Sequence, residues 1–592
     1  MPDRRASGRQ ALDQTVWDHK WGFADTQFIV HEDRSVELTG SRYLLSGYRM
    51  YHFLPYVEEV LGITLDLDDV KQEVVDKPVD PPHRNEEFCA AVASTFRGDQ
   101  FTFDDRQRLL HSHGQTTTDE VYRVLYERLE RFADMVFFPE SEDDVVRLVE
   151  LADRHNVCLV PFGGGTSVSC ALTLPPQEKR MIVVVDMRRM NRILWVDPVN
   201  RRACVEAGIR GLDLEEELNR QGFTCGHEPD SIELSTLGGW IATNASGMKK
   251  NRYGNIEQLV EQITLVTPRG AVEHLQPLPR VSQGVQPQLL AFGSEGNLGI
   301  ITKAVIKIFP KPEVTRYGSL VFPNFRLGVQ FLEELSKTDY IPASIRLVDN
   351  IQFRFGMALK GPESASAALV ESLKKFAVTR VLGFDPDQMV AATIVMEGSR
   401  SEVAYQEKNL FRLARKYHGI SGGADAGRRG YMLTYAIAYI RDFVARYHII
   451  GETFETSVPW SKIEDVCKAV ETRAAEEHRK YRLPGKFYVS YRITQVYHTG
   501  VCIYFMMGLY MKGVPQPADV FARIEKSLRQ AIMESGGSIS HHHGVGKLRA
   551  PFMHRVLSPA AIDLVRGLKA VTDPGNVFGI RNNVFAEPGE LL

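Results

Sequence analysis

Three loops built from small residues constrain the fold of this chain more than any other feature. The first, Gly163–Ser167, directly follows the apolar run Val157–Phe162, which is typical of a buried strand. Because glycine lacks a Cβ, consecutive backbone N–H groups in such a loop can converge on an anion, and a diphosphate would fit there. A plain tight turn explains three glycines equally well. The G-x-G-x-x-G dinucleotide fingerprint is absent from this position.

The other two loops strengthen the case for a dinucleotide site. One extends from Asp230 to Gly239 and continues through Ala242–Gly247, and the other is Gly293–Gly299. Each supplies hydroxyls and exposed backbone groups suited to phosphates, a ribityl chain and the edge of a flavin ring. Three such loops are hard to explain as turns alone.

Helical and strand-like patterns alternate around these loops. A capping box at Ser141 and Asp144 predicts a helix that ends near Arg154. The pattern further predicts a helix over 119–132, strands over 181–187, 259–267 and 299–309, a hairpin over 193–208, and a helix over 212–221. These elements together indicate an α+β domain.

A second domain is predicted after Pro312, because Pro310 and Pro312 interrupt the strand pattern. Amphipathic helices are expected there over 325–337, 401–417 and 461–481, separated by strand-like runs. A further helix is predicted over 560–572, followed by a turn at Asp573–Asn576 that returns the chain to the body. With 592 residues, the chain is long enough for two to four structural units.

The charge balance and apolar runs exclude several functions. A net charge of −3, from 71 basic and 74 acidic residues, gives no global field for binding nucleic acid. The most apolar stretch, Val501–Met511, is far shorter than the roughly 20 residues that span a bilayer, so we expect only peripheral membrane contact. The seven cysteines lie far apart without paired spacing, which favours a reducing compartment.

The segment His541–Lys547, with sequence HHHGVGK, places three imidazoles in a row inside a folded domain. It follows Ser538–Ser540, which we interpret as a strand-like lead-in. A partly buried polar strand end is the alternative to a catalytic role. A metal site is not expected, because adjacent strand residues point to opposite faces and no other ligand cluster is visible.

The loop sequences PFGGGTS, TLGG, ATNASG and GSEGNLG resemble the FAD domain of vanillyl-alcohol-oxidase-type flavoproteins. The resemblance implies noncovalent FAD between two α+β subdomains, an α/β cap domain and a helical N-terminal region. It assigns FAD binding to Pro161, Phe162, Gly163, Gly164, Gly165, Thr166, Ser167, Asp230, Ser231, Ser235, Thr236, Thr243, Asn244, Ala245, Ser246, Gly293, Ser294, Glu295, Gly296, Asn297, Leu298 and Gly299. The expected boundaries are 1–129, 130–312 (FAD), 313–545 (cap) and 546–592 (C-terminal segment).

A more specific resemblance extends over nearly the whole chain. HHHGVGK together with WGFADTQF, ELTGSRYLLSG, SIRLVDN, YIRDF, GETFETSVPW and VCIYF is similar to the alkyldihydroxyacetonephosphate synthase family. That family exchanges the acyl chain of acyl-dihydroxyacetone phosphate for a long-chain fatty alcohol in ether-lipid (plasmalogen) synthesis. The resemblance implies a flavin N5 adduct with the substrate carbon and no net redox change.

The resemblance also implies the catalytic residues. Arg346 and Arg441 match active-site arginines and suit a phosphate or a leaving carboxylate, although a salt bridge is the commoner role of an arginine. Tyr504 matches the catalytic tyrosine, whose phenol could move a proton if neighbouring histidines or an arginine lowered its pKa. His541, His542 and His543 complete the set, and which of them carries the proton stays open. The apolar segment 431–450 is a plausible wall for the alkyl tunnel, although a core helix is the commoner meaning.

The resemblance implies a homodimer on a peripheral membrane surface in a peroxisome or glycosome. The chain nevertheless ends Gly589–Leu592 without an S-K-L signal. An FAD-dependent 2-hydroxy-acid dehydrogenase of the same fold is the main alternative, since it too could use a histidine base and arginines. A flavin-binding scaffold without turnover is the third alternative, but it leaves HHHGVGK unexplained.

Overall fold

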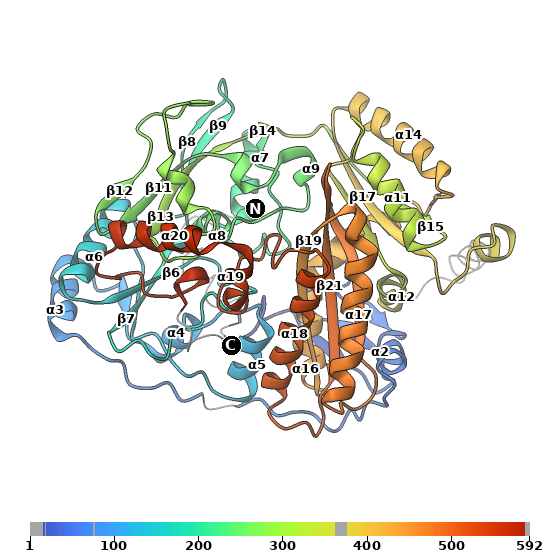
Figure 1. Cartoon of the computed structure of the whole chain (residues 1–592), viewed down its shortest axis with the longest axis horizontal. Helices are drawn as coiled ribbons and strands as arrows, with labels where there is room; N and C mark the ends of the chain where they lie inside the picture. Colours follow the sequence, from blue (N-terminus) through green and yellow to red (C-terminus); the bar gives the residue numbers. More distant parts are fainter. Residues whose placement is uncertain (1–15, 18, 75–76, 362–375, 587–592) are drawn as a thin grey trace.

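The computed structural model describes residues 16–17, 19–74, 77–361 and 376–586. The last residues, 587–592, which include the segment Gly589–Leu592 considered above for an S-K-L signal, lie outside this range. In Figure 1 a mixed α+β body with two small sheets occupies the left side, and one large sheet with its covering helices occupies the right side. The chain therefore has the α+β fold that the sequence predicts.

The first small sheet contains the strand that leads into the glycine loop. Its strands are β4 (Phe101–Thr102), β5 (Met135–Phe137), β7 (Ile182–Asp186) and β6 (Cys158–Phe162), in that order. β5, β7 and β6 are parallel, so the carboxyl end of β6 delivers the loop to one edge of the sheet. Helices α3 (Glu86–Thr95) and α6 (Glu142–Arg154) pack on this sheet through a shared apolar core.

Helix α6 confirms the capping signal in the sequence. Its N-cap residue, Ser141, accepts a hydrogen bond from the backbone N–H of Asp144. Val145, Leu148 and Val149 are spaced for one helical face and are buried against the sheet. The helix ends at Arg154, as predicted.

The second small sheet is antiparallel and carries the other two loops at its edge. Its strand order is β12 (Gly270–Val272), β11 (Val260–Thr267), β13 (Ile300–Lys307), β9 (Arg202–Glu206) and β8 (Ile193–Asp197). The predicted hairpin over 193–208 is the β8–β9 pair. Helices α7 (Gly211–Arg220), α8 (Leu237–Thr243) and α10 (Ile256–Leu259) cover the sheet, and α8 begins within the second small-residue segment.

The large sheet has seven strands and is antiparallel throughout. In order, they are β18 (Ile420–Ser421), β15 (Val314–Phe322), β17 (Val390–Gly398), β16 (Ser344–Val348), β20 (Tyr488–Val496), β21 (Gly500–Tyr510) and β19 (Ile449–Pro459). Helices α11 (Phe325–Leu335), α14 (Arg400–Lys416), α17 (Ile463–Lys480) and α18 (Pro517–Glu534) share one core with this sheet. The three amphipathic helices predicted in this domain are α11, α14 and α17.

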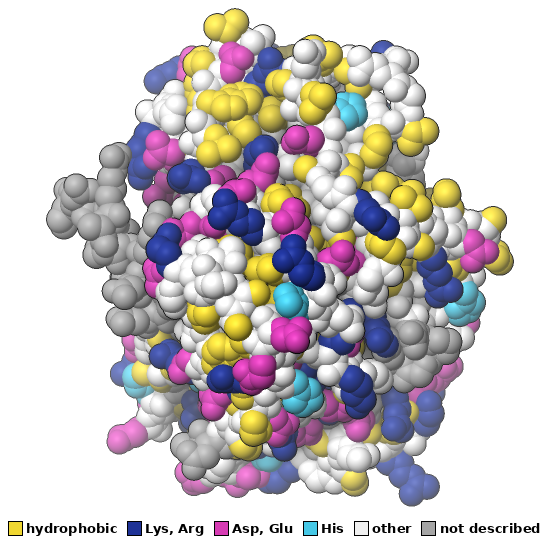
Figure 2. All heavy atoms as spheres, turned by 90° about the vertical axis from the view of Figure 1, so that its left-hand side faces the viewer, with side chains coloured by type: hydrophobic (Ala, Val, Ile, Leu, Met, Phe, Trp, Pro, Cys, Tyr) yellow, Lys and Arg dark blue, Asp and Glu magenta, His cyan; other side chains and the backbone are white. Residues whose placement is uncertain are grey.

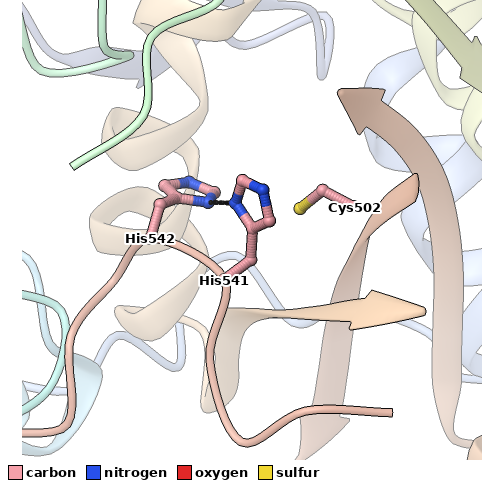
Figure 3. A group of neighbouring side chains, drawn as sticks. All are labelled: Cys502, His541 and His542. Atoms are coloured by element: carbon pink, nitrogen blue, oxygen red, sulfur yellow. Dashed lines mark hydrogen bonds between the residues drawn. The ribbon is translucent and has the colours of Figure 1, made fainter. Parts of the chain in front are cut away.

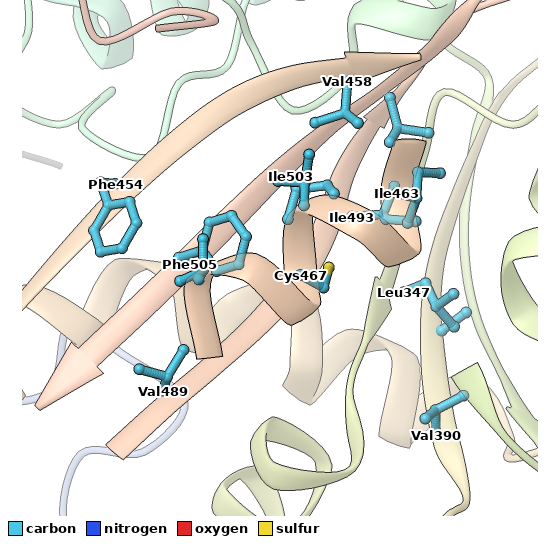
Figure 4. Packing of buried hydrophobic residues seen from close by; sticks show 14 of the residues in the cluster. Leu347, Val390, Phe454, Val458, Ile463, Cys467, Val489, Ile493, Ile503 and Phe505 are labelled. Carbon is cyan, nitrogen blue, oxygen red and sulfur yellow. The ribbon is translucent and has the colours of Figure 1, made fainter. Parts of the chain in front are cut away.

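The helix-covered face of the sheet is largely apolar, with Glu452 and Thr456 of β19 as buried polar exceptions. Figure 4 shows Leu347, Phe454, Ile493, Ile503 and Phe505 in one apolar cluster with Ile463 and Cys467 of α17. Because side chains alternate along a strand, the residues between them point to the other face. That second face is turned toward the FAD-type loops.

The N-terminal region contains the small sheet β1 (Phe28–Val30), β2 (Val36–Leu38) and β3 (Arg49–Met50), followed by helices α2 (Phe53–Leu61) to α5 (Thr118–Tyr126). The helix predicted over 119–132 ends early, at Tyr126, where Glu127 leaves helical geometry. Leu129 and Phe132 then pack against Val124 from non-helical chain. Leu129 and Phe132 have the spacing of a helical face in the sequence, but the residues that carry them are not helical.

The tail returns to the first small sheet. After helix α20 (Pro559–Thr572), the carbonyl of Val577 accepts a hydrogen bond from the N–H of Leu159 at 2.7 Å, beside β6. Figure 2 shows basic and acidic side chains interspersed over one face of the molecule, as the near-zero net charge implies. Among the described residues, no helix has the length and apolar character needed to cross a membrane.

Candidate active site

A cavity of about 380 Å³ lies between the small-residue loops and the large sheet. The loops form one wall, and the polar face of β16, β20 and β21 forms the opposite wall. The third wall comes from helix α16 (Ile437–Ala445) and the residues just before it. The cavity therefore brings together the sequence motifs that were predicted to bind a cofactor and to carry chemistry.

The first two loops are packed against each other. A Cβ on Gly164 would lie 2.1 Å from the carbonyl oxygen of Leu234, and one on Gly163 would lie 2.4 Å from Oγ1 of Thr236. Gly165 alone of these three glycines has a positive φ, 70°. Close backbone approach, more than turn geometry, therefore requires glycine at 163 and 164.

Most of the predicted FAD-binding residues line the cavity. Those that line it are Pro161, Phe162, Gly163, Gly164, Gly165, Thr166, Ser167, Asp230, Ser231, Ser235, Thr236, Thr243, Ala245, Ser246, Ser294, Glu295, Gly296 and Gly299. Asn244, Gly293, Asn297 and Leu298 are not part of the lining. The side chain of Asn297 instead joins Ser294 to Asn582 and so fixes the tail.

Several loop hydroxyls already have protein partners. Ser235 accepts from the indole of Trp240 at 2.8 Å, Thr243 donates to the carbonyl of Gly239, and Ser246 donates to Asn255. These side chains hold the shape of the loops. Backbone N–H groups and the absence of bulky side chains are then the features left to receive a ligand.

Glu295, predicted as an FAD-binding residue, connects the third loop to the histidine segment. Its Oε1 accepts hydrogen bonds from the N–H groups of Val545 at 2.6 Å and Gly546 at 2.9 Å. A Cβ on Gly544 would lie 2.4 Å from the same oxygen. Burial raises the pKa of Glu295, and the two N–H groups oppose that rise.

Alternation along the large sheet places the catalytic candidates. Arg346 on β16 and Tyr504 on β21 point into the cavity, whereas their neighbours Leu347, Ile503 and Phe505 point into the helix-covered core. Arg492 on β20 lies on the same polar face and also lines the cavity. Sequence reasoning missed Arg492. The alternating pattern of YVSYRITQV nevertheless places its side chain on the other face of the strand from its neighbour Ile493, which lies in the core.

Two buried guanidinium groups share one carboxylate. Nη2 of Arg346 lies 3.2 Å from Oδ1 of Asp230, and Nη2 of Arg492 lies 4.0 Å from Oδ2. Arg346 also donates to Oγ1 of Thr434 at 2.5 Å. Among the described residues, neither Nε atom has a hydrogen-bond partner. The group carries one net positive charge with free N–H groups, which suits a phosphate or carboxylate ligand.

Tyr504 stands between this cationic group and the histidines. Its ring centroid lies 4.4 Å from the guanidinium carbon of Arg492 and 5.2 Å from the His543 ring. Its hydroxyl is 3.2 Å from Oγ1 of Thr453. Burial raises the pKa of Tyr504, and Asp230 adds to the rise, while Arg492 and Thr453 oppose it. The condition under which the phenol was suggested to move the proton, a lowered pKa, is therefore not met, because desolvation outweighs the nearby cation.

The histidine segment is not a strand, contrary to the sequence interpretation. Residues 538–546 form bends without ladder pairing, and their backbone wraps around Glu455 of β19. The Glu455 carboxylate accepts from the N–H groups of His541, His542 (3.3 Å) and His543 (2.9 Å), and from Oγ of Ser540 at 2.7 Å. A buried carboxylate thus replaces sheet partners for three consecutive residues.

The electrostatics of Glu455 follow from these contacts. Burial opposes its negative charge, yet the imidazoles of His543, His542 and His541, once protonated in acid, and the Arg549 guanidinium hold its pKa well below the usual range. Burial lowers the pKa of His543 well below its ordinary value and also lowers that of His542. Both imidazoles are therefore neutral at physiological pH and able to accept a proton.

The three histidines occupy different places. His542 and His543 line the cavity, and His541 does not. His541 contacts Tyr497 through Nε2 at 2.6 Å and His542 through Nδ1 at 2.9 Å. Figure 3 shows the rings of His541 and His542 joined by this contact, with Cys502 pointing toward them.

The ligand atoms of Cys502, His541 and His542 lie within 4.8 Å of one another. The alternation argument against a metal site therefore does not apply, because this segment is not a strand. Burial nevertheless raises the pKa of the Cys502 thiol well above its ordinary value, and both His541 nitrogens have hydrogen-bond partners. The neighbouring Lys250 ammonium adds positive charge beside His541. The site thus favours a hydrogen-bonded cluster over a bound cation.

Arg441 lies on helix α16 and lines the cavity from the apolar side. Its guanidinium donates to the carbonyl oxygens of Thr116 and Gln115 and to Oδ1 of Asp442, the last at 2.6 Å. Residues of the predicted tunnel segment 431–450 surround it, including Ile437, Ile440 and Val444. This wall of the cavity is predominantly apolar.

Glu455, like Arg492, was missed by the sequence analysis. It lies within GETFETSVPW, a motif noted for its resemblance but not for any charge. A run of three imidazoles in a buried segment requires an anionic or hydrogen-bonding partner, and the two glutamates of this motif were candidates. Choosing between Glu452 and Glu455 required the structure.

The cavity residues fit an FAD molecule. Small side chains and backbone at 163–167, 235–239, 242–246 and 294–299 line the cavity, and a Cβ at Gly163 or Gly164 would break the contact between the first two loops. The cavity continues to Tyr504, His542 and His543. A dinucleotide held along the loops would bring its reactive ring to the polar face of the large sheet.

Comparison with known proteins agrees with this arrangement. A family model for an FAD binding domain matches residues 133–276, and one for the C-terminal domain of FAD linked oxidases matches residues 311–580. The chain is 43% identical to an alkyldihydroxyacetonephosphate synthase of Caenorhabditis elegans over 95% of its length and 94% of that protein. A second enzyme of that name, from Trypanosoma brucei brucei, is 30% identical over 98% of the chain and 93% of that protein.

Solved structures give the same result for the fold. A structure of an alkyldihydroxyacetonephosphate synthase superposes with a TM-score of 0.83 at 28% identity, covering 96% of this chain and 98% of that one. The structure of p-cresol methylhydroxylase has a TM-score of 0.62 at 15% identity, covering 85% of this chain and 98% of that one. The latter likeness shows the fold alone.

Proposed function

The chain belongs to the alkyldihydroxyacetonephosphate synthase family of FAD-dependent enzymes, and from that premise we propose that it replaces the acyl chain of acyl-dihydroxyacetone phosphate with a long-chain fatty alcohol. The observation that carries this proposal is the set of groups that line the cavity between the small-residue loops and the large sheet. It combines an FAD-type cradle, a two-arginine anion site, neutral proton-transfer groups and an apolar wall. Each of these corresponds to one part of the substrates or of the reaction.

The arginine pair supports binding of the substrate phosphate. Arg346 and Arg492 are almost completely buried, and Asp230 neutralises only one of their two charges. A buried phosphate dianion needs cations that present several N–H groups in fixed directions, and a guanidinium provides them. Arg441, at the apolar wall, would receive the carboxylate of the departing fatty acid in competition with its present partner Asp442.

Tyr504, His542 and His543 support proton transfer at the substrate carbon. The phenol of Tyr504 keeps its proton at neutral pH and is therefore an acid or a hydrogen-bond donor in the resting enzyme. The two neutral imidazoles are the bases. Their backbone is fixed by Glu455 and the following residues by Glu295, so the cluster is held before substrate binds.

The wall formed by helix α16 supports binding of the alkyl chains. Ile437, Ile440 and Val444 line the cavity on this side, and Val57 and Leu61 of α2 extend the apolar surface. Burying a methylene contributes about 0.8 kcal/mol, so a long chain gains most of its affinity here. The predicted tunnel segment thus has a second wall from the N-terminal region.

The small-residue loops would hold the FAD noncovalently, with backbone groups of 163–167 toward its diphosphate. When bound, FAD supplies an electrophilic N5 that can hold the substrate carbon without net oxidation or reduction. The protein residues position the substrate, move its proton and stabilise its charges. The product would enter ether-lipid (plasmalogen) synthesis.

Location and assembly are proposed on the family resemblance alone. A homodimer on a peripheral membrane surface of a peroxisome or glycosome fits an enzyme with lipid substrates. Peripheral attachment is compatible with the described helices, none of which could span a bilayer.

The test is incubation of the purified yellow protein with acyl-dihydroxyacetone phosphate and labelled hexadecanol. Formation of the alkyl ether without oxygen consumption supports the exchange reaction. Absence of product, with anaerobic bleaching of the flavin by a 2-hydroxy acid, would move the assignment to a dehydrogenase of the same fold. Absence of both reactions would favour a scaffold.

A further inference from the structure

A second groove, of about 560 Å³, lies beside the main cavity. Its walls come from helix α9 (Lys250–Tyr253) and from the turn between β20 and β21. Arg252 and His498 are exposed at its rim, so the groove opens to solvent. The described residues that line it include no aspartate or glutamate.

Hydrogen bonds connect this groove to the main cavity. Tyr497 lines the groove, and its hydroxyl lies 2.6 Å from Nε2 of His541. Nδ1 of His541 lies 2.9 Å from Nδ1 of His542, which lines the main cavity. Asn255 donates to the Tyr497 oxygen at 3.3 Å, which fixes the phenol in this position. Each step has the length of an ordinary hydrogen bond.

We propose that Tyr497, His541 and His542 form a proton relay between the main cavity and the solvent of the second groove. The relay accounts for the one histidine of the triplet that does not line the cavity. It rests on the proposed function, because it supplies and removes the proton that the exchange reaction takes from the substrate carbon and later returns. Tyr497 and His541 are positioning residues in this scheme, since they act through His542.

The proton balance of the relay closes in both directions. When His542 accepts the substrate proton at Nε2, its Nδ1 proton moves to Nδ1 of His541, the Nε2 proton of His541 moves to the Tyr497 oxygen, and the phenol proton passes to water. When His542 donates, water protonates Tyr497 and every transfer reverses. Each group begins and ends neutral with one proton, and the two imidazoles exchange tautomers.

The groups that face His541 favour this concerted transfer over a stored charge. They are Tyr497, His542, Cys502, Lys250 and Glu455. Burial lowers the pKa of His541 to about 3, and His542 adds to the effect while Glu455 opposes it. The Nζ of Lys250 lies 3.5 Å from the centroid of the Tyr497 ring, which further disfavours a neighbouring imidazolium.

The test compares Tyr497→Phe with Tyr253→Phe in the complete FAD-loaded enzyme. Tyr253 lines the same groove, but its hydroxyl donates to Glu397 and has no contact with the histidines. The reaction is run in D₂O with protiated acyl-dihydroxyacetone phosphate, and the recovered ether product is analysed by mass spectrometry. The readout is the fraction of product that carries solvent deuterium at the reacting carbon.

Wild type and Tyr253→Phe should give product that contains deuterium. Tyr497→Phe should retain the original hydrogen in most turnovers, because His542 can then only return the proton it took. The deuterated fraction should fall about tenfold, and kcat should fall by less than the roughly 10²- to 10⁴-fold expected for loss of the acid–base group itself. Equal deuterium content in all three proteins would overturn the relay.

The outcomes separate the relay from the proposed function. If wild type forms no ether product, the proposed function fails before the relay is tested by this reaction. The relay is then measured by the pH dependence of the His541 and His542 imidazole resonances in ¹⁵N-labelled protein, where Tyr497→Phe should change the tautomer shifts and Tyr253→Phe should not. Unchanged shifts in Tyr497→Phe would overturn the relay.

Discussion

The two walls of the large cavity are built on different principles. The FAD cradle consists of short loops in which glycines allow backbone to touch backbone, as at Gly164 and Leu234. The opposite wall consists of buried charges and imidazoles, such as Arg346, Arg492 and Glu455, drawn from three strands of one sheet. Holding a cofactor requires shape, whereas moving protons requires charges whose partners are fixed in advance.

The largest expected effect is a loss of turnover without a loss of flavin, which would assign proton transfer to one wall and cofactor binding to the other. Tyr504→Phe and His542→Ala should each lower turnover by about 10²- to 10⁴-fold, because each removes a proton-transfer group. Flavin content should stay at the wild-type level, since neither residue belongs to the cradle loops. Steady-state ether synthesis and flavin absorbance check both statements. Wild-type rates in both variants would remove these residues from the proposed chemistry.

The second prediction concerns a substitution in the FAD cradle that should reduce flavin binding. Gly164→Ala places a methyl group against the Leu234 carbonyl and should destabilise the protein by about 1–3 kcal/mol and lower its flavin content. Gly239→Ala is the matched control, because Gly239 lines the same cavity and its Cβ would lie 3.4 Å from the nearest atom, Oγ1 of Thr236. Flavin per protein and thermal unfolding are measured together. Equal flavin loss in both variants would contradict the packing argument.

The third prediction concerns the pH dependence of the stability that Glu455 contributes. Glu455→Gln keeps the side-chain shape but removes the charge that three N–H groups face, and it should cost about 1.5–3 kcal/mol of unfolding free energy at neutral pH. The pKa of Glu455 is depressed in the folded protein, so its contribution is complete above about pH 4.3, the unfolded value, and is lost as pH falls through the folded value.

The stability difference between wild type and Glu455→Gln should therefore shrink only in acid. Glu334→Gln serves as a control, because Glu334 pairs with Lys416 at the surface, where such pairs contribute at most about 1 kcal/mol. Urea unfolding at several pH values measures the difference. A difference that stays constant from neutral to acidic pH would mean that the Glu455 charge does not stabilise the histidine segment.

The same contrast explains what the sequence could predict. The cradle loops follow strands directly and carry their glycines and hydroxyls in short segments, so local patterns sufficed to find them. Helix α6 was predicted to its last residue because its cap and its apolar spacing are also local. Even there, the packing of Gly163 against Thr236 joins positions that no local pattern relates.

The sequence predicted only some residues of the wall that carries the proposed proton-transfer groups. Tyr504 and the histidines were found by their resemblance to a family, but Arg492 and Glu455 act through partners 262 and 86 or more residues away, at Asp230 and His541. The sequence left the direction of the Tyr504 pKa shift open, because the shift depends on burial, which motif reading does not give. The histidine segment was interpreted as a strand because the sequence does not show that Glu455 accepts its backbone hydrogen bonds.

The smallest expected effect concerns the Thr453 hydroxyl beside the Tyr504 phenol. Thr453→Val removes an oxygen 3.2 Å from the Tyr504 hydroxyl at nearly constant volume. We expect kcat to fall about fivefold, which corresponds to about 1 kcal/mol for one neutral hydrogen bond. The Thr453 contact also restrains the rise in the Tyr504 pKa, so any alkaline limb of the rate profile that reports the phenol should move to higher pH.

Thr315→Val is the control for Thr453→Val, because Thr315 lies on the same sheet and contacts Glu397 outside the catalytic cluster. A loss as large as that of Tyr504→Phe would mean that Thr453 itself takes part in proton transfer. No loss at all would mean that the phenol is oriented by Arg492 and the histidines alone. A fivefold loss would place Thr453 among the groups fixed in advance, which distinguish the catalytic wall from the cradle.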